Sequence, residues 1–421
     1  MLQQIIGSHA EEPSRTLPYG RHFIDEDDIA AVAGVLRGDY LTTGPAVEDF
    51  ERALASATGA REAVALANGT AALHLAARAL GLGPGDTVIV PAITFVATAN
   101  AARFVGAEVV FADVDPDSGL HDAEHCAPRS SWRGGGGGRR RRTTSGKRAL
   151  FNVHLAGQCE DLEEIARIAR EAGLLILDDA CHAIGTEYRT MAGKWHKVGS
   201  CAHSDLTVFS FHPVKTIAMG EGGAIALNNS ALAAHIRRDR SHGLERDPAL
   251  LSASFSRDLD GAPAPWAYEL VAPGYNYRAS DIHCALAASQ LKKLSKFVRE
   301  RRALMALYER MLEPLWPVVR PLSRVAACLP AWHLNVALVD FARAGTTRTA
   351  LMGKLKARGI GTQVHYIPVH RQPYYEDRYG AQDLPGAEVY YRNCLTLPLF
   401  VGLSEDDVAR VCDALAELAA G

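Results

Sequence analysis

The sequence lacks the features typical of membrane proteins, disulfide-rich secreted proteins and zinc modules. No stretch of about 20 apolar residues occurs, because proline and polar residues interrupt the best candidate, residues 87–102. The eight cysteines are scattered, and none forms the C-x-x-C spacing of a zinc site. The N-terminus also lacks the long apolar core of a secretory signal. We therefore expect a cytoplasmic protein with reduced thiols, no membrane partner and no bound metal.

The chain also lacks a strong net charge of either sign. Its 421 residues include 45 lysines and arginines and 48 acidic residues, a formal charge of −3, which gives no general reason to expect nucleic acid as a partner. Residues 129–148 depart from this balance, with five consecutive glycines, four consecutive arginines and no acid. Glycine loses the most backbone entropy on ordering and neighbouring arginines repel one another, so we predict an atypical solvated loop there. The alternative is a basic patch that binds a polyanion.

Short apolar runs alternate with amphipathic segments through the first two thirds of the chain. The short runs are rich in branched residues, as in strands buried on both faces, whereas the amphipathic segments have helical spacing. The expected strands are residues 87–91, 108–112, 149–153 and 174–177. The expected helices are residues 25–37, 47–56, 70–80 and 161–172. This alternation predicts an α/β fold with a mostly parallel central sheet.

The pattern changes beyond about residue 285. One long amphipathic helix is expected over residues 285–312, followed by strands at 332–340 and 361–367 and by helices at 346–358 and 404–419. We therefore predict an N-terminal tail over residues 1–20, a large domain over 21–285, and a smaller α+β domain over 286–421.

Three short motifs carry the chemistry. An apolar strand runs directly into Asp178 and Asp179, and the carboxyl end of a parallel strand is where α/β sheets bind ligands. Lys215 lies between two apolar strands, where desolvation makes an amine a nucleophile able to form a Schiff base. Asn68, Gly69 and Thr70 open a helix whose amides can hold a phosphate, although such a motif is more often an ordinary cap. Together they indicate pyridoxal phosphate, whose pyridinium nitrogen pairs with a carboxylate.

The chain resembles the DegT/DnrJ/StrS family of pyridoxal-phosphate-dependent nucleotide-sugar aminotransferases. The similar stretches, which run in family order, include ANGTAAL, VIVPAITFVATANA, LDDACHAIGT, FSFHPVKTIAMGEGGAI, PGYNYRASDIHCALAASQL and VHYIPVH. The resemblance implies the aspartate-aminotransferase fold type (fold type I), with a mostly parallel sheet and a smaller C-terminal domain. The sequence departs from the family pattern at residues 129–148, where the family normally has a helix.

The resemblance also implies roles for individual residues. Lys215 is expected to bind the cofactor covalently and then to move the proton, while Asp179 pairs with the pyridinium nitrogen. His182 is expected near the phenolic oxygen of the cofactor ring. Phe95 is expected to stack on one ring face, with an ordinary core aromatic as the alternative. The residues expected at the phosphate are Gly69, Thr70 and Ser210, joined by Asn276 from the partner subunit.

The same resemblance implies a homodimer with shared active sites, because Asn276 would reach the cofactor of the other subunit. Tyr275 and Arg278 position cofactor or substrate, or else hold the interface. The residues expected to contact the sugar are Thr43, Gly44, His365 and Tyr366, with packing as the alternative for His365.

The implied activity is transfer of an amino group from glutamate to C4 of a 4-keto-6-deoxy nucleotide sugar. The lysine block is most similar to that of enzymes acting on UDP-2-acetamido-2,6-dideoxy-β-L-arabino-hex-4-ulose in pseudaminic acid synthesis. Perosamine-type and other 4-keto or 3-keto sugar aminotransferases share most of these residues. Family members that dehydrate the sugar carry histidine at the lysine position, so Lys215 disfavours that reaction. A different class also remains, a regulatory protein that binds pyridoxal phosphate without turnover.

Overall fold

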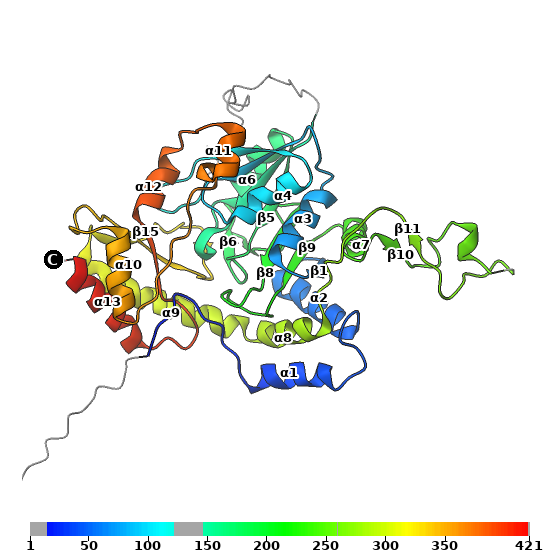
Figure 1. Ribbon diagram of the computed structural model, residues 1–421, viewed down its shortest axis with the longest axis horizontal. Helices are drawn as coiled ribbons and strands as arrows, with labels where there is room; N and C mark the ends of the chain where they lie inside the picture. The colour runs from blue at the N-terminus through cyan, green and yellow to red at the C-terminus, as the bar shows by residue number, and fades with distance from the viewer. Residues whose placement is uncertain (1–14, 122–145, 259, 420–421) are drawn as a thin grey trace, which may run out of the picture.

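A seven-stranded sheet forms the centre of the computed structural model, which describes residues 15–121, 146–258 and 260–419 (Figure 1). Its strand order is β1-β9-β8-β5-β4-β2-β3, and only β9 runs antiparallel to its neighbours. The strands are β1 (Glu62–Leu66), β2 (Thr87–Pro91), β3 (Glu108–Ala112), β4 (Arg148–Val153), β5 (Leu174–Asp179), β8 (Leu206–Ser210) and β9 (Gly223–Leu227). The predicted α/β class with a mostly parallel sheet is therefore confirmed.

Helices cover both faces of this sheet. They are α2 (Pro45–Thr58), α3 (Gly69–Ala79), α4 (Val96–Phe104), α6 (Leu162–Glu171), α7 (Ser230–Asp239) and α8 (Asp281–Lys292), whereas α1 (Glu26–Leu36) packs on the outside of α8 (Figure 1). Alternate residues of each strand point to opposite faces, so Ala63 and Ala65 of β1 pack in the cluster with α2, α6 and α8. Val64 and Leu66 pack on the other face with α3, α4 and α7. The four helices predicted in this part are confirmed within a few residues at each end.

The single long helix predicted over residues 285–312 is wrong. The chain forms α8 and then α9 (Leu294–Leu312), with Lys293 between them at φ −97° and ψ −2°. The two helices have different partners, because α8 packs on α1 and α2 whereas α9 packs on the C-terminal helix. The Lys293 amine also binds Asp25 and Asp28 at the start of α1, at 2.5 and 2.7 Å. Tertiary packing therefore sets a boundary that the apolar pattern does not mark.

The C-terminal part is built around a small antiparallel sheet in the order β12-β14-β15. Its elements are β12 (Val319–Pro321), β14 (Asn335–Val339), α10 (Arg348–Ala357), α11 (Pro373–Tyr379), α12 (Pro385–Asn393), β15 (Cys394–Leu397) and α13 (Glu405–Ala419). Helices α10 and α13 confirm the predictions at 346–358 and 404–419, and β14 lies within the strand predicted at 332–340. The strand predicted at 361–367 is wrong, since only an isolated bridge joins Gln363 to Thr396. The boundary at 285/286 between two domains stays a prediction.

An arm projects from the body of the molecule between residues 244 and 271 (Figure 1). Its base is a short ladder of β10 (Leu244–Glu245) and β11 (Glu269–Leu270). A second small sheet combines β6 (Glu187–Arg189), β7 (Trp195–Lys197) and β13 (Cys328–Leu329).

Most of the Gly/Arg segment 129–148 lies outside the described residues, as do residues 1–14 of the predicted tail. Within the described ranges, no helix is long and apolar enough to cross a membrane, and no group of side chains has the arrangement of a metal site.

Candidate active site

The predicted chemistry meets at the carboxyl ends of β5 and β8, which are parallel neighbours in the sheet. Asp179 ends β5 and pairs with Val208 of β8. The chain leaves β8 at Ser210 and passes through a turn containing Lys215 before β9 begins at Gly223. Parallel topology therefore brings the aspartate and the lysine motifs to one edge of the sheet.

The carboxylate of Asp179 is buried and held at both oxygens. Thr98 donates its hydroxyl hydrogen to Oδ2 at 2.6 Å, and the backbone N–H of Cys181 donates to Oδ1 at 3.2 Å. Asp178 has different partners, because the Asn152 amide donates to its Oδ1 at 3.0 Å and His154 Nε2 lies 3.5 Å away. The charge of Asp179 opposes the burial that lowers the pKa of Lys215, and Asp178 has no such effect on the lysine. Alternation along β5 thus separates two adjacent aspartates.

Lys215 has the environment expected of a nucleophilic amine. Burial lowers the pKa of Lys215 below its ordinary value, and the neighbouring Cys181 and Asp179 oppose that change. The lysine charge in turn lowers the pKa of His182 and His365, although burial is the larger cause for both. The amine therefore lies near enough to act on both histidines, and it holds its proton less tightly than an exposed lysine does.

A candidate phosphate site lies where α3 begins. The Asn68 side chain accepts from the N–H of Ala71 at 2.8 Å and caps the helix, leaving the first-turn amides at Gly69 and Thr70. A Cβ on Gly69 would lie 2.9 Å from the Cβ of Ser210 and 3.2 Å from its Oγ. Glycine is thus required for the helix to approach the end of β8 this closely. The structure brings Gly69, Thr70 and Ser210 together at a helix N-terminus, which suits a phosphate.

Histidines and a tyrosine form one wall of the site. His182 Nδ1 accepts from the backbone N–H of Ala156 at 3.3 Å, so Nε2 carries the proton and donates to the Tyr366 hydroxyl at 3.1 Å. Burial lowers the pKa of His182 well below its ordinary value, which keeps the ring neutral. His333, which the sequence motifs did not indicate, lies 4.5 Å from the His182 ring centre. His333 lies outside the stretches that resemble the family, and nothing in the sequence around it indicates a contact with His182.

His365 and Phe95 have opposite environments. His365 is buried, its Nδ1 lies 2.8 Å from the Thr396 hydroxyl, and burial lowers its pKa to about 3. Phe95 is 56% exposed beside the Tyr366 ring, with 6.1 Å between ring centres. The alternative that Phe95 is a core aromatic is therefore wrong, whereas His365 has partners that packing alone explains.

The remaining predicted residues have their contacts elsewhere in the chain. The Gly44 amide donates to the Asp281 carboxylate at 2.8 Å, next to exposed Thr43. Tyr275 packs on His74, and exposed Asn276 forms a backbone bridge with Ser241. Arg278 lies close by in sequence and is partly exposed. Among the described residues, the hydrogen bonds and ring contacts of this set do not reach Lys215 or Asp179.

These residues fit pyridoxal phosphate. The first turn of α3 and Ser210 suit its phosphate, the amine of half-buried Lys215 suits its aldehyde, and the Asp179 carboxylate suits its ring nitrogen. A model of the DegT/DnrJ/EryC1/StrS aminotransferase family matches residues 22–416. The chain belongs to this family. The predictions of fold type I, of pyridoxal phosphate as cofactor and of a transaminase are thereby confirmed.

Solved structures agree with this assignment. PseC of Helicobacter pylori, described as an aminotransferase involved in the biosynthesis of pseudoaminic acid, is 27% identical with a TM-score of 0.83, covering 96% of this chain and 100% of PseC. DesV of S. venezuelae is 30% identical with a TM-score of 0.79, covering 96% and 99%. The aminotransferase TlmJ of Streptoalloteichus hindustanus is 28% identical with a TM-score of 0.81, covering 96% and 99%.

Proposed function

We propose that this aminotransferase transfers the amino group of glutamate to C4 of a 4-keto-6-deoxy nucleotide sugar. We take the acceptor to be UDP-2-acetamido-2,6-dideoxy-β-L-arabino-hex-4-ulose. The observation that carries the reaction class is the desolvated Lys215 amine beside the buried Asp179 carboxylate. The similarity to PseC over nearly the whole chain, together with the lysine block, supports this acceptor. Seven buried or half-buried free cysteines in the described part support a reducing, cytoplasmic location.

Pyridoxal phosphate, when bound, supplies an electron sink and carries nitrogen between the two substrates. Lys215 would hold its aldehyde carbon, and the amine released by the incoming amino donor would take and return the substrate proton at Nζ. The lowered pKa of Lys215 favours this role, since more of the amine is then free base near neutral pH. Asp179 would hold the positive ring nitrogen through its buried negative charge.

The other walls would orient the cofactor and exclude water. The amides of Gly69 and Thr70 and the Ser210 hydroxyl would bind the phosphate, and Phe95 would cover one ring face. His182 donates to the Tyr366 hydroxyl, which leaves the tyrosine hydrogen free to donate toward the site. We therefore assign Tyr366 and His182 together to the phenolic side of the ring. His365 would support this wall through Thr396 and Tyr366 rather than bind sugar directly.

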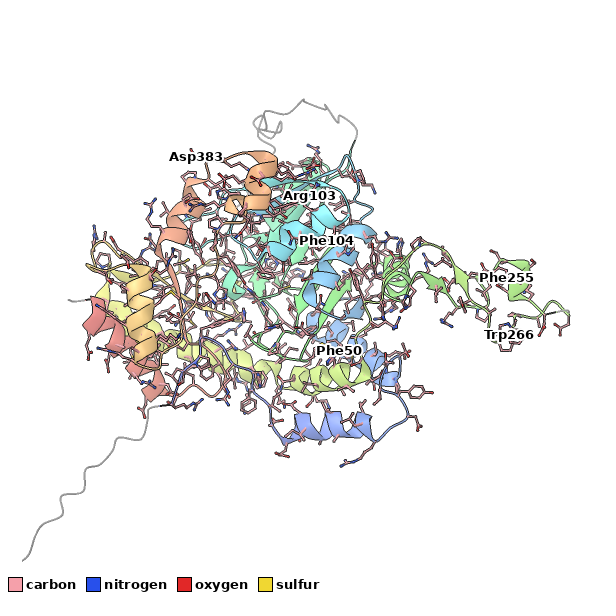
Figure 2. The ribbon with its side chains drawn as sticks, in the orientation of Figure 1. Phe50, Arg103, Phe104, Phe255, Trp266 and Asp383 are labelled. Carbon is pink, nitrogen blue, oxygen red and sulfur yellow. The ribbon has the colours of Figure 1, made fainter. Side chains whose placement is uncertain are left out.

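We further propose a homodimer in which Asn276, Tyr275 and Arg278 serve the partner's site. Three observations support it. Asn276 is exposed, and the contacts of Tyr275 lie away from Lys215 of the same chain. The neighbouring arm carries Phe255 and Trp266 in solvent, which favours burial against another copy (Figure 2).

Incubation with glutamate and a panel of 4-keto and 3-keto nucleotide sugars tests the function. We expect 2-oxoglutarate and a C4-amino product, identified by mass spectrometry and NMR, to form fastest with the UDP-linked N-acetyl sugar. Faster turnover of a perosamine precursor or a 3-keto sugar would reassign the acceptor. No spectral response of the bound cofactor to glutamate, with no product from any sugar, would favour the regulatory protein.

A further inference from the structure

A pair of buried threonines connects Asp179 to the segment that carries Phe95. Thr98 donates to Asp179 Oδ2 at 2.6 Å, and the hydroxyl oxygens of Thr94 and Thr98 lie 2.7 Å apart. The single hydroxyl hydrogen of Thr98 is used on the carboxylate, so Thr94 is the donor in the second bond. Thr98 is 0% exposed, and Thr94 is buried as well. The chain of hydrogen bonds therefore runs in one direction, from Thr94 through Thr98 to Asp179.

The same short segment presents Phe95. Helix α4 begins directly after Phe95, and the backbone N–H of Thr98 donates to the Phe95 carbonyl at 3.2 Å. One helical turn thus carries a ring that faces the site on its outer side and a hydroxyl that binds the carboxylate on its inner side. Movement of this turn would change both positions together.

We propose that Thr98, oriented by Thr94, is a positioning residue for transamination, because it fixes the Asp179 carboxylate and keeps its charge available to the ring nitrogen. This inference rests on the proposed role of Asp179. A hydroxyl suits the task since it stabilises the anion without adding a positive charge that would compete with the ring. Without this hydrogen bond the Asp179 carboxylate would be a less stable anion, so a bound ring nitrogen would keep less positive charge and the ring would withdraw electrons less strongly.

The substitution Thr98→Val removes the hydroxyl with little change in volume, and Thr98→Ser retains it. In the Val variant we expect kcat to fall about tenfold, as one charge-assisted hydrogen bond allows, while KM for glutamate stays within about twofold. We also expect the pH midpoint of the bound cofactor's absorption band to rise by about one unit. Thr98→Ser should retain the wild-type midpoint and most of kcat. Thr94→Val should shift both quantities in the same direction by less.

A purely structural role for Thr98 predicts other results. If Thr98→Val retains the wild-type midpoint and kcat, or if Thr98→Ser is as impaired as Thr98→Val, the positioning role is overturned. Thr94→Val serves the same test if Thr98→Val does not fold, as judged by its melting temperature. Asp179→Asn separates the two levels of inference. If Asp179→Asn and Thr98→Val both retain the wild-type pH midpoint and kcat, the proposed role of Asp179 fails. If Asp179→Asn changes the midpoint and lowers kcat while Thr98→Val does neither, only the inference about Thr98 fails.

A second, independent observation concerns two thiols far apart in sequence. Cys159 Sγ and Cys328 Sγ lie 3.7 Å apart, and the backbone N–H of Cys159 donates to Cys328 Sγ at 3.4 Å. Cys159 is buried, whereas Cys328 is partly exposed. The hydrogen bond to Cys328, together with burial, raises the pKa of Cys159, while the hydrogen bonds from Cys159 lower the pKa of Cys328. The accessible thiol is therefore the more nucleophilic of the two.

We propose that Cys159 and Cys328 form a reversible disulfide by exchange with a small-molecule disulfide. The Cys328 thiolate attacks one sulfur and releases one thiolate, giving a mixed disulfide. Cys159 then loses its proton, attacks the Cys328 sulfur and releases the second thiolate, so the small disulfide takes up both electrons. The bond would tie Cys159, three residues after the Ala156 amide that binds His182, to strand β13.

Intact-mass analysis of the holoenzyme with oxidised glutathione tests this pair. We expect the wild type to form an internal disulfide without retained glutathione, reversed by dithiothreitol. Cys159→Ser should retain one glutathione, and Cys328→Ser should stay unmodified at this pair. Cys412→Ser, a buried control, should behave as wild type. A wild type that retains glutathione on Cys328, or that stays fully reduced while Cys159→Ser is modified, overturns the proposal.

Discussion

The carboxyl end of the sheet at Asp179 and the projecting arm differ in how well their side chains are covered by the rest of the chain. At the edge, the carboxylate of Asp179 and the ring of His182 find hydrogen-bond partners within the same chain. On the arm, Trp266 is 71% exposed and Phe255 is similarly open to solvent (Figure 2). The polar groups around Asp179 are therefore held by contacts within one copy of the chain, whereas the arm has apolar area that one copy leaves uncovered. Substitutions in the two regions should consequently change different measurements.

The largest effect should follow Lys215→Ala at the sheet edge. Loss of the amine removes both the covalent attachment and the proton carrier, so we expect turnover to fall by about 10⁴-fold or more. Cofactor should still bind non-covalently through the remaining residues. Steady-state 2-oxoglutarate formation measures the loss, and Lys194→Ala on the exposed surface is the control. Turnover within tenfold of wild type would contradict the assignment.

The candidate phosphate site at the start of α3 gives the next effect. In Gly69→Ala, the new Cβ would meet the Ser210 Cβ at 2.9 Å, so the helix and the end of β8 must separate. We expect the dissociation constant for pyridoxal phosphate, from titration of the apoenzyme, to rise about 10- to 100-fold, as overpacking of about 1–3 kcal/mol implies.

A matched control exists in α10. At Gly353 a Cβ would meet nothing within 4 Å, so Gly353→Ala should leave cofactor affinity unchanged. Equal affinity in Gly69→Ala and wild type would show that the close approach of α3 to Ser210 is unnecessary for binding.

The positions of Asp179 and Lys215 were predictable because each residue follows an apolar strand in the sequence, at or just beyond the strand's carboxyl end. Motif order and parallel topology placed Asp179 and Lys215 together, whatever the detailed packing. The contact between His333 and His182 was not predictable, since it joins two distant segments and neither carries a periodic signal. Strand β1 was missed for a local reason, because its alanine-rich sequence EAVAL has no branched run. The break at Lys293 was missed because it depends on contacts with α1.

The arm should respond in association rather than in catalysis within one subunit. For Trp266→Ser we expect the dissociation constant of the proposed dimer, from analytical ultracentrifugation, to rise about tenfold, as loss of an exposed aromatic anchor implies. The free energy of unfolding of the subunit should change by less than about 0.5 kcal/mol, because the side chain has few contacts within its own chain. Met191→Ser, at an exposed turn outside the arm, is the control. Equal weakening in both variants would contradict a role for the arm.

The smallest effect should arise at the other end of the sheet strands, where Glu108 begins β3. Burial raises the pKa of Glu108, but hydrogen bonds from Arg378 and Tyr379 of α11 outweigh this and lower it to about 2 from an ordinary 4.5. The folded chain therefore binds fewer protons than the unfolded chain between these values. Its contribution to stability is present above about pH 4.5 and is lost as the pH falls toward 2.

Glu108→Gln should reduce the free energy of unfolding at pH 7 by about 1 kcal/mol, since the side chain is 44% exposed and its ion pairs are screened. Urea denaturation at pH 7 and pH 3 measures this, and the gap between wild type and variant should narrow at the lower pH. Glu48→Gln, whose partner Arg52 is exposed on α2, should change stability by less than about 0.5 kcal/mol. A gap that widens on acidification would contradict the direction of the Glu108 pKa shift. Unchanged turnover in Glu108→Gln at pH 7 would separate this stabilising network from the chemistry at the opposite strand ends.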